Sequence, residues 1–402
     1  ISLYDSYEYS YLGETGVYPA NLELSNLKWQ TTTQVNFGMN FAAFKNRLNI
    51  DVEVYQKRSK DQYFQNLSLP STTGFTKADV NSGSMENKGF ELSVNTVPYR
   101  SKAWNISFNI NLARNINSIL DVPDQYPMQK GVLTTNGQYV RRFELGQPIG
   151  AIYGFRYKGV YLNDDQTIAR DANGNKIYSY DASGKRTPVQ MRFAYPTIDY
   201  QFKAGDAIYE DINHDGNIDY QDVVYLGNAN PILTGGFGPN IRYKSVSVSA
   251  FFNFRYGNKV INKMGMSLQN MASYNNQSKA VLRRWRHPYE DEATAPTDLL
   301  PRAVYGSKNA YNYLGSDRFV EDGSFLRFKT LTVKYTFDKK QLKNTFLQSC
   351  QIWTTLSNLY VWTNYSGMDP EIALTGGAFK MGEDNSRIPR SFTATLGMSV
   401  TF

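Results

Sequence analysis

The stretch Trp104-Asn105-Ile106-Ser107-Phe108-Asn109-Ile110-Asn111-Leu112 alternates apolar and small polar side chains without a break. A period of two residues is that of a β-strand, whose successive side chains point to opposite faces. One face of this strand is therefore apolar and the other polar. A strand of about 9–11 residues with that pattern is long enough to cross a bilayer in a barrel. We expect Trp104, Ile106, Phe108, Ile110 and Leu112 to face lipid, and Asn105, Ser107, Asn109 and Asn111 to face the lumen.

The same alternation recurs along the whole chain, in segments 29–41, 48–54, 90–94, 246–256, 331–337, 352–362 and 392–402. Three positions break it. Phe251 is an apolar residue on a polar face, and Thr354 and Asn358 are polar residues on an apolar face. About ten strands are visible, and we interpret them as part of a wall, because an open wall leaves unpaired backbone edges in lipid.

The connections between these segments alternate between short and long. Short links fall at 42–46, 98–102, 244–245 and 338–347, and long links at 59–86, 115–232, 258–323 and 364–390. This is typical of a transmembrane barrel with short periplasmic turns and long extracellular loops. A soluble β-sandwich also alternates apolar and polar residues, but it does not sort its links by length in this way. The sequence therefore predicts an all-β, antiparallel outer-membrane barrel.

The composition agrees with a wall that has one apolar and one wet face. The chain has 30 Tyr, 23 Phe and 5 Trp, yet its mean hydropathy is -0.49. No run of 18 apolar residues occurs, so no transmembrane helix is predicted. The net charge is +7, but acidic residues are interspersed among the basic ones, which favours scattered solvated charge over a nucleic-acid surface.

The sequence offers little for catalysis. Cys350 is alone, and His214 and His287 are far apart, so a disulfide framework, a zinc site or a catalytic Cys/His pair is poorly supported. No nucleophile–base pair or phosphate loop stands out, and we expect no enzyme. The long loops carry many tyrosines that could grip sugars or peptides, although packing is the more general expectation for each of them: Tyr153, Tyr157, Tyr161, Tyr178, Tyr180, Tyr289, Tyr305, Tyr311 and Tyr313.

Several stretches, taken together and in order, carry a family resemblance. They are NLKWQTTTQ at 26–34, ENKGFE at 86–91, PIGAIYGF at 148–155, 211–238 with its GGFG end, VEDGSFLR at 320–327, LSNLYVWT at 356–363, DPE at 369–371, and Phe402. The chain resembles the C-terminal barrel region of the SusC/RagA family of TonB-linked outer-membrane proteins of Bacteroidetes.

The resemblance implies a barrel of about 22 strands, a class whose lumen is plugged. It also implies an N-terminal plug domain, a TonB-contacting segment, a SusD/RagB-like surface lipoprotein that acts as a lid, and a possible dimer of the transporter–lipoprotein pair. Phe402 would be read by the barrel-assembly machinery. We expect residues 1–402 to be the C-terminal barrel portion, with a signal peptide and the plug upstream of Ile1.

The sharpest local motif is DINHDGNIDYQD at 211–222. It places oxygen-bearing side chains at positions 1, 3, 5, 9 and 12, with glycine at position 6, as in an EF-hand-type calcium loop whose final Glu is replaced by Asp. The alternative is an Asx-rich turn without an ion. We predict a structural Ca²⁺ in an outer loop, held by Asp211, Asn213, Asp215, Asn217 (through its backbone carbonyl), Asp219 and Asp222.

The leading functional hypothesis is an active importer of oligosaccharides or peptides in the outer membrane, working with TonB and the lipoprotein lid. One alternative is another outer-membrane barrel, such as a siderophore receptor or a porin. A second alternative is a soluble calcium-binding β-sandwich adhesin. The sequence does not name the substrate.

Overall fold

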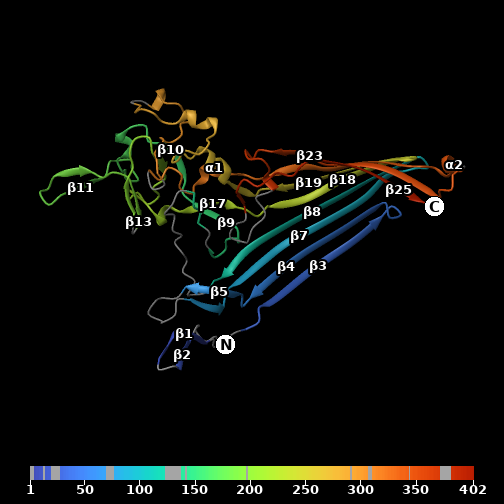
Figure 1. Cartoon of the computed structure of the whole chain (residues 1–402), viewed down its shortest axis with the longest axis horizontal. Coiled ribbons are helices and arrows are strands. Elements are labelled where there is room, and N and C mark those ends of the chain that lie inside the picture. Colours follow the sequence, from blue (N-terminus) through green and yellow to red (C-terminus); the bar gives the residue numbers. More distant parts are fainter. Residues whose placement is uncertain are drawn as a thin grey trace. The chain divides into compact units, whose positions relative to one another are not determined.

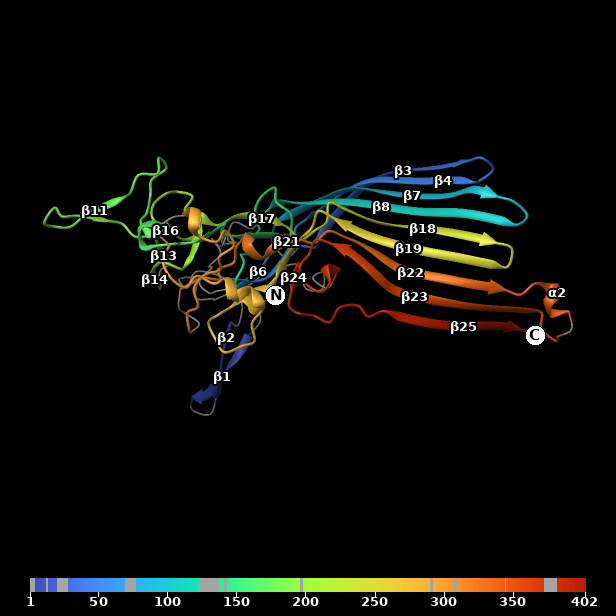
Figure 2. The same ribbon diagram turned by 90° about the horizontal axis from the view of Figure 1, so that it is seen from above.

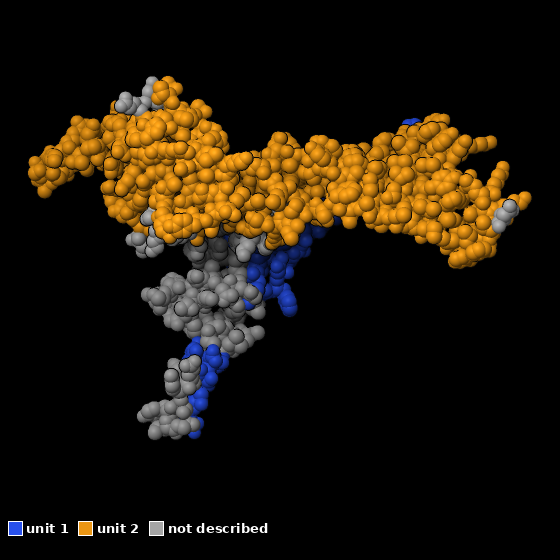
Figure 3. All heavy atoms as spheres, turned by 45° about the horizontal axis from the view of Figure 1, so that its top comes forward, with its two compact units in different colours: residues 1–94, 112–129, 143–149 blue, residues 95–111, 130–142, 150–402 orange. Residues whose placement is uncertain are grey.

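The computed structural model describes residues 4–11, 14–19, 28–68, 77–122, 137–140, 143–195, 198–289, 292–306, 310–343, 345–371 and 382–402. Residues 26–27 of the first family stretch lie outside these ranges, as do parts of the four long links. The chain divides into two compact units (Figure 3). The first comprises residues 1–94, 112–129 and 143–149, and the second comprises residues 95–111, 130–142 and 150–402.

The main element is a nine-stranded sheet in which the strands follow one another in chain order, β25-β23-β22-β19-β18-β8-β7-β4-β3 (Figure 1). Each alternating segment of the sequence lies largely within one of these strands, and 233–243 supplies a strand between two predicted links. Their bounds are β3 (Thr31–Ala43), β4 (Leu48–Lys60), β7 (Ser84–Arg100), β8 (Trp104–Asp121), β18 (Leu233–Tyr243), β19 (Val246–Tyr256), β22 (Phe325–Thr336), β23 (Ser349–Thr363) and β25 (Thr393–Thr401).

Strands β18, β19, β22, β23 and β25 lie side by side in the second unit, each antiparallel to the next (Figure 2). In the first unit, β3 and β4 pair antiparallel over their whole length, from Thr31 opposite Lys60 to Ala43 opposite Leu48. Sequential strands joined by hairpins are the arrangement of an up-and-down barrel wall. The predicted fold class, part of a transmembrane antiparallel barrel, is confirmed.

The polar exception at Asn358 marks a β-bulge. In the β22–β23 pairing, Phe328 lies opposite Tyr360 but Thr330 lies opposite Ser357, so β23 contains one extra residue. Asn358 has a φ of 56°, in the left-handed region, and its side chain donates a 2.9 Å hydrogen bond to the carbonyl of Ser391. A bulge of this kind takes a residue out of the alternation, which is why the pattern fails there.

The apolar exception, Phe251, covers two glycines on the polar face. A Cβ atom built on Gly236 would lie 2.7 Å from the Phe251 ring, and one built on Gly238 would lie 3.4 Å from it. The same arrangement recurs twice on that face. The ring of Tyr55 lies over Gly89, and the indole of Trp353 lies over its cross-strand partner Gly397.

The long link 115–232 folds around a hydrophobic core, which the sequence analysis did not predict and which includes Tyr311 and Leu314 of the link 258–323. Its small strands are β9 (Ala151–Gly154) paired with β17 (Val224–Asn228), β10 (Tyr157–Val160) with β15 (Ala207–Tyr209), β11 (Tyr178–Tyr180) with β12 (Arg186–Pro188), and β13 (Arg192–Tyr195) between β14 (Ile198–Gln201) and β16 (Asn217–Ile218). Short 3₁₀ helices cover Asp164–Thr167 and Tyr220–Asp222. Phe155 and Phe193 are fully buried at the centre of this core, where Phe155 packs against Tyr209.

The remaining elements belong to the other links and to the residues that precede β3. β20 (Lys259–Asn262) pairs with β21 (Val320–Asp322) and β24 (Glu383–Asp384), β5 (Tyr63–Ser68) with β6 (Lys77–Asn81), and β1 (Tyr4–Tyr11) with β2 (Glu14–Pro19). The helices are α1 (Lys263–Gln269), α2 (Lys339–Leu342) and 3₁₀ turns at Lys279–Arg283, Glu292–Thr294 and Asp317–Phe319. Within the described ranges, no helix is both long and apolar enough to span a membrane.

Candidate functional site

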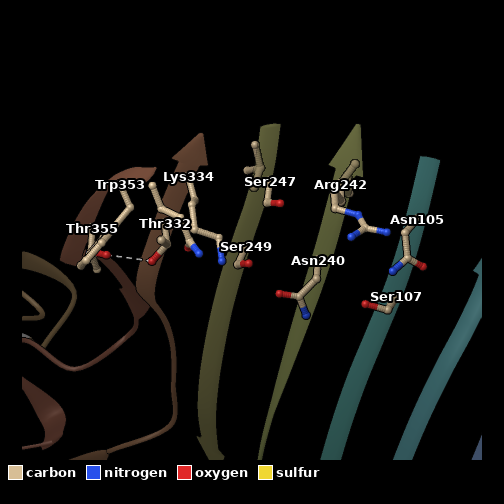
Figure 4. A pocket seen from close by; sticks show the side chains of 13 residues that line it. Asn105, Ser107, Asn240, Arg242, Ser247, Ser249, Thr332, Lys334, Trp353 and Thr355 are labelled. Carbon is tan, nitrogen blue, oxygen red and sulfur yellow. Dashed lines mark hydrogen bonds between the residues drawn. The ribbon is translucent and has the colours of Figure 1, made fainter. Parts of the chain in front are cut away.

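One face of five consecutive strands carries a continuous polar surface (Figure 4). It lines an open pocket of about 530 Å³ on β8, β18, β19, β22 and β23. The lining residues are Asn105, Ser107, Asn240, Ile241, Arg242, Ser247, Val248, Ser249, Thr332, Lys334, Gln351, Trp353 and Thr355. Most of these side chains are polar, whereas the neighbouring residues of each strand that point the other way are largely apolar.

The register of the strands arranges these side chains in two rows. In the first row, which we call the basic row, Arg242 lies opposite Ser247, Ser247 opposite Lys334, and Lys334 opposite Trp353. The second row consists of Asn240, Ser249, Thr332 and Thr355, in that order. Residues directly opposite each other on one face of a sheet are in contact range. The hydroxyl oxygens of Thr332 and Thr355 are 3.0 Å apart.

The predicted partition of segment 104–112 agrees with these rows. Asn105 and Ser107 lie on the polar face, and Trp104, on the other face, packs its ring 4.4 Å from that of Tyr243. Phe108 and Ile110 are exposed on the apolar face, at 38% and 37% of their maximal areas. Exposed apolar side chains on one whole face suit a sheet whose outer solvent is lipid.

Two of the family stretches, 320–327 and 369–371, meet in a buried charge cluster, which we call the arginine cluster. Arg327 Nη2 is 2.5 Å from Asp369 Oδ1, and Arg327 Nε is 3.0 Å from Glu371 Oε2. Arg390 Nε lies 3.2 Å from the same Glu371 oxygen. The side chains of Arg327 and Asp369 are each only 4% exposed, whereas Arg390 is 52% exposed. The cluster joins the loop that follows β23 to strand β22.

A second cluster joins the same loop to β21. The Glu321 carboxylate accepts hydrogen bonds of 2.8 Å from Ser366 N, Ser366 Oγ and Asn262 Nδ2. Asn262 also caps α1, because its Oδ1 accepts from Gly265 N at 2.6 Å. Tyr365 donates to the buried Asp384 at 2.6 Å, and burial together with this carboxylate raises the pKa of the Tyr365 phenol. Residues 320–327 therefore hold the loop that follows β23 through the hydrogen bonds of Glu321 and the ion pairs of Arg327.

The 211–222 loop turns tightly around the backbone groups of its own residues. The Asp211 carboxylate accepts from Gly216 N at 2.8 Å, and Asp215 accepts from Asn217 N at 2.7 Å. Asp222, which is fully buried, accepts from Ile212 N at 2.8 Å and from Asp219 N at 2.9 Å. Gly216 has a φ of 86°, as the sharp turn at position 6 requires.

The carboxylates of this loop repel one another. Burial raises the pKa of Asp222 to about 6, and the charges of Asp211 and Asp219 add to that shift. Burial and the nearby Asp215 likewise raise the pKa of Asp211. In the part of the chain that the structure describes, no three His, Cys, Asp or Glu side chains gather closely enough to hold a metal ion. The calcium site therefore stays a prediction. Its residues lie in one loop, but their carboxylates accept hydrogen bonds from backbone N–H groups.

The loop tyrosines divide between packing and exposure. Tyr153, Tyr161, Tyr311 and Tyr313 are at most 7% exposed, and the first three belong to the core around Phe155 and Phe193. Tyr157, Tyr178 and Tyr289 are partly buried. Tyr180 and Tyr305 are exposed at 68% and 67%. Packing therefore explains the buried tyrosines, as the general expectation held.

Sequence reasoning missed Arg242 and the role of Arg327. The signal for Arg242 was present, because residues 233–243 also alternate, with Asn240 and Arg242 on one face. Arg327 was part of a family stretch, but nothing in its neighbours indicates a partner that lies 42 residues further along the chain.

The comparisons with known proteins agree with this architecture. The family described as "TonB dependent receptor-like, beta-barrel" matches residues 2–181. The TonB-dependent receptor P39 of Formosa agariphila is 28% identical over 100% of this chain. The TonB-dependent receptor SusC of Bacteroides thetaiotaomicron is 25% identical over 94% of it. The chain spans 38% of the first relative and 32% of the second.

Solved structures share the fold. The structure of the RagAB peptide transporter matches the whole chain with a TM-score of 0.68 and 23% identity, over 38% of its own chain. The same importer in its open-open state matches with a TM-score of 0.70 and 23% identity, also over 38%. The family match, the named relatives and the shared fold agree with the motifs of the sequence. The chain thus has the fold of part of an outer-membrane β-barrel and is similar to TonB-dependent receptors of the SusC/RagA type.

Proposed function

We propose that the protein imports oligosaccharides or peptides across the outer membrane. The observation that carries the proposal is the polar face of the sheet, where two rows of hydrogen-bonding side chains cross four strands in register. Such a face lines a water-filled passage in a barrel whose other face meets lipid. The likeness to a structure described as a peptide transporter supports the same reading.

The loops and the wall would play different parts in this import. The long link 115–232 is folded around a core that it shares with Tyr311 and Leu314, and the loop after β23 is fixed to β22 of the wall through Arg327 and to β21 through Glu321. A rigid outer rim can present a fixed surface to a lid, which supports a SusD/RagB-like lipoprotein as partner. The family resemblance supports TonB as the source of energy, so the barrel needs no catalytic residue of its own.

Growth of the strain that encodes the protein tests this proposal. Deletion of the gene should abolish growth on a defined peptide mixture or on one oligosaccharide of a panel. The full-length gene should restore it, whereas a gene that lacks the TonB-contacting segment should not. Import without TonB contact would indicate a porin, and a defect confined to iron-poor medium would indicate a siderophore receptor.

We also propose that the 211–222 loop binds one structural Ca²⁺. The mutual repulsion of its carboxylates supports this, because a divalent cation would offset the charges of Asp211 and Asp219, which add to the burial that raises the pKa of Asp222. Ile218, at position 8 of the loop, is fully buried against the aromatic core and pairs with Phe193. An ion in the loop would therefore stiffen the folded link, and would not take part in chemistry.

A further inference from the structure

The short turns of the wall hold most of the net positive charge of the chain. The four short links, 42–46, 98–102, 244–245 and 338–347, contain seven basic residues and one acidic residue. They therefore carry six of the seven net positive charges, and the charges of the rest of the chain nearly balance. Short turns lie at the periplasmic end of a transmembrane barrel. The excess of cations is therefore concentrated at that end of the strands.

Three of these turns lie side by side in the second unit and form what we call the periplasmic rim, residues 100–103, 244–245, 337–343 and 345–348 (Figure 2). Lys244 N donates a 2.7 Å hydrogen bond to Ala103 O, and Thr336 N donates a 2.9 Å hydrogen bond to Ser245 O. Backbone contacts thus join each turn to its neighbour. The basic residues of the rim are all exposed: Arg100, Lys102, Lys244, Lys339, Lys340 and Lys343.

Aromatic rings accompany these cations on the lipid-facing side. The rings of Phe346 and Phe402 stack with their centroids 5.5 Å apart, and the two residues are 79% and 70% exposed. Tyr243 packs against Trp104, and Lys244 Nζ lies 5.2 Å from the centroid of the Tyr243 ring. Girdles of aromatic residues mark the boundary between the hydrocarbon and the headgroups of a membrane. The cations of the rim therefore lie at the depth of the lipid headgroups.

Gln341 holds the α2 turn against the lipid-facing side of the wall. Its Oε1 accepts a 2.8 Å hydrogen bond from Asp338 N, and its Nε2 donates a 2.8 Å hydrogen bond to the Tyr335 hydroxyl. Tyr335 lies opposite Val246 and Ile352, on the apolar face of the sheet. The turn is thereby held beside lipid and not over the lumen. It carries three lysines within five residues: Lys339, Lys340 and Lys343.

Closure of the barrel leaves this side of the turn in contact with the membrane. The turn connects β22 and β23, and each of these strands has a neighbour on both sides in the sheet. Further strands pair with the edges, β3 and β25, and a plug fills the lumen. Neither covers the lipid-facing side of the α2 turn.

We propose that the periplasmic rim binds the anionic phosphates of phospholipid headgroups in the periplasmic leaflet of the outer membrane. Clustered lysines beside a bilayer surface attract anionic lipid over a distance of about one Debye length. Lysine suits this role, because its apolar stem can lie along the hydrocarbon boundary while its ammonium group reaches the phosphates. The rim would thereby fix the depth of the wall in the membrane. This inference does not depend on which molecule the barrel imports.

The test uses the full-length protein in detergent, titrated with fluorescent phosphatidylglycerol or with fluorescent, zwitterionic phosphatidylcholine. Fluorescence anisotropy gives the two dissociation constants. The wild type should bind phosphatidylglycerol more tightly, and this preference should fall with rising ionic strength. A variant that combines Lys339→Gln, Lys340→Gln and Lys343→Gln should weaken phosphatidylglycerol binding about fivefold or more, the effect expected from even one lysine at a membrane surface.

Two matched variants make the test specific. The combination of Lys339→Arg, Lys340→Arg and Lys343→Arg keeps the charge of the turn and should retain the preference. The second variant removes the same charge from exposed positions of the long links and should leave phosphatidylglycerol binding unchanged. It combines Lys185→Gln, Lys203→Gln and Lys279→Gln.

Several results would overturn the proposal. Equal dissociation constants for the two lipids in the wild type would do so, and this measurement needs no variant. An equal loss of binding in the two triple glutamine variants would assign the attraction to overall net charge. In cells, a photo-cross-linking residue in place of Phe346 should capture phospholipid. Capture of a periplasmic protein or of another part of the chain in its place would assign the rim to a protein contact.

Discussion

At the scale of single residues, several glycines of the wall leave room for aromatic rings that pack against them. A Cβ on Gly397 would lie 2.4 Å from the indole of Trp353, its cross-strand partner, so that this ring would have to shift. We expect Gly397→Ala to lower the free energy of unfolding by about 1–3 kcal/mol through overpacking. Gly38→Ala is the control, because the nearest atom to its Cβ is 3.9 Å away. Urea unfolding of the full-length protein in detergent measures both, and equal effects would contradict the role of the ring.

In the arginine cluster, we expect one residue, Arg327, to contribute most of the stability. Arg327→Met should destabilise the protein by about 3–5 kcal/mol, because it leaves the nearly buried Asp369 and Glu371 without their central cation. Arg390→Met should cost at most about 1 kcal/mol, because Arg390 is 52% exposed and its ion pair is screened by water. Thermal unfolding measures both variants. Limited proteolysis should cut the loop after β23 faster only in the Arg327 variant. Equal cleavage rates in the Arg327 and Arg390 variants would contradict this prediction.

At the scale of the strand, β8 offers a direct test of which face meets lipid. Phe108→Arg should cost about 2–4 kcal/mol if the residue lies near the midplane, because the arginine would replace an apolar side chain on the lipid face. Asn111→Arg, on the exposed polar face of the same strand, should cost much less. Unfolding in lipid vesicles measures the two. Spin labels at Ser107 that report lipid contact would reverse the assignment of the two faces.

At the scale of the loop, the 211–222 segment should respond to calcium. Addition of Ca²⁺ should protect the segment from proteolysis and from hydrogen exchange, and chelation should remove that protection. Asp215→Ala should abolish the response while the barrel stays folded, because the loop lies outside the nine-stranded sheet. Asp171→Ala, in the neighbouring Asx turn of the same link, is the control. Protection that does not depend on calcium in the wild type would leave only the Asx-turn interpretation.

The sequence predicts best those strands that have lipid on one face and the polar lumen on the other, because these two environments impose the alternation of apolar and polar residues. Alternation found the strands of the sheet because each residue there meets either lipid or the polar lumen face. It failed at Phe251, where a ring covers two glycines, and at Asn358, where a bulge adds a residue. It did not predict the core around Phe155 and Phe193, because short strands paired across long loops leave no period to count. The ion pair of Arg327 with Asp369 is likewise a property of the fold and not of either motif alone.

At the scale of the whole molecule, the stability of the sheet in lipid depends on pairing its two edge strands, β3 and β25, with further strands. In the described sheet, β3 and β25 each pair with a single neighbour, and a row of unpaired backbone groups is not tolerated in lipid. The curated relatives are longer proteins, of which this chain spans 38% or less. Stability measured on the full-length protein is therefore the relevant quantity, because closure of the wall affects every strand in it.

Assembly of that closed wall should depend on Phe402, which follows β25. Its ring stacks on Phe346 at a centroid distance of 5.5 Å and an interplanar angle of 4°. If Phe402 is only part of an aromatic girdle, Phe402→Ala and Phe346→Ala remove the same stacked pair and should lower membrane levels equally and modestly. If assembly machinery reads Phe402, as the family resemblance implies, only Phe402→Ala should sharply reduce the folded barrel. We expect the second result. The heat-modifiable band of the outer-membrane fraction measures it, and equal bands for the two variants would leave only the girdle role.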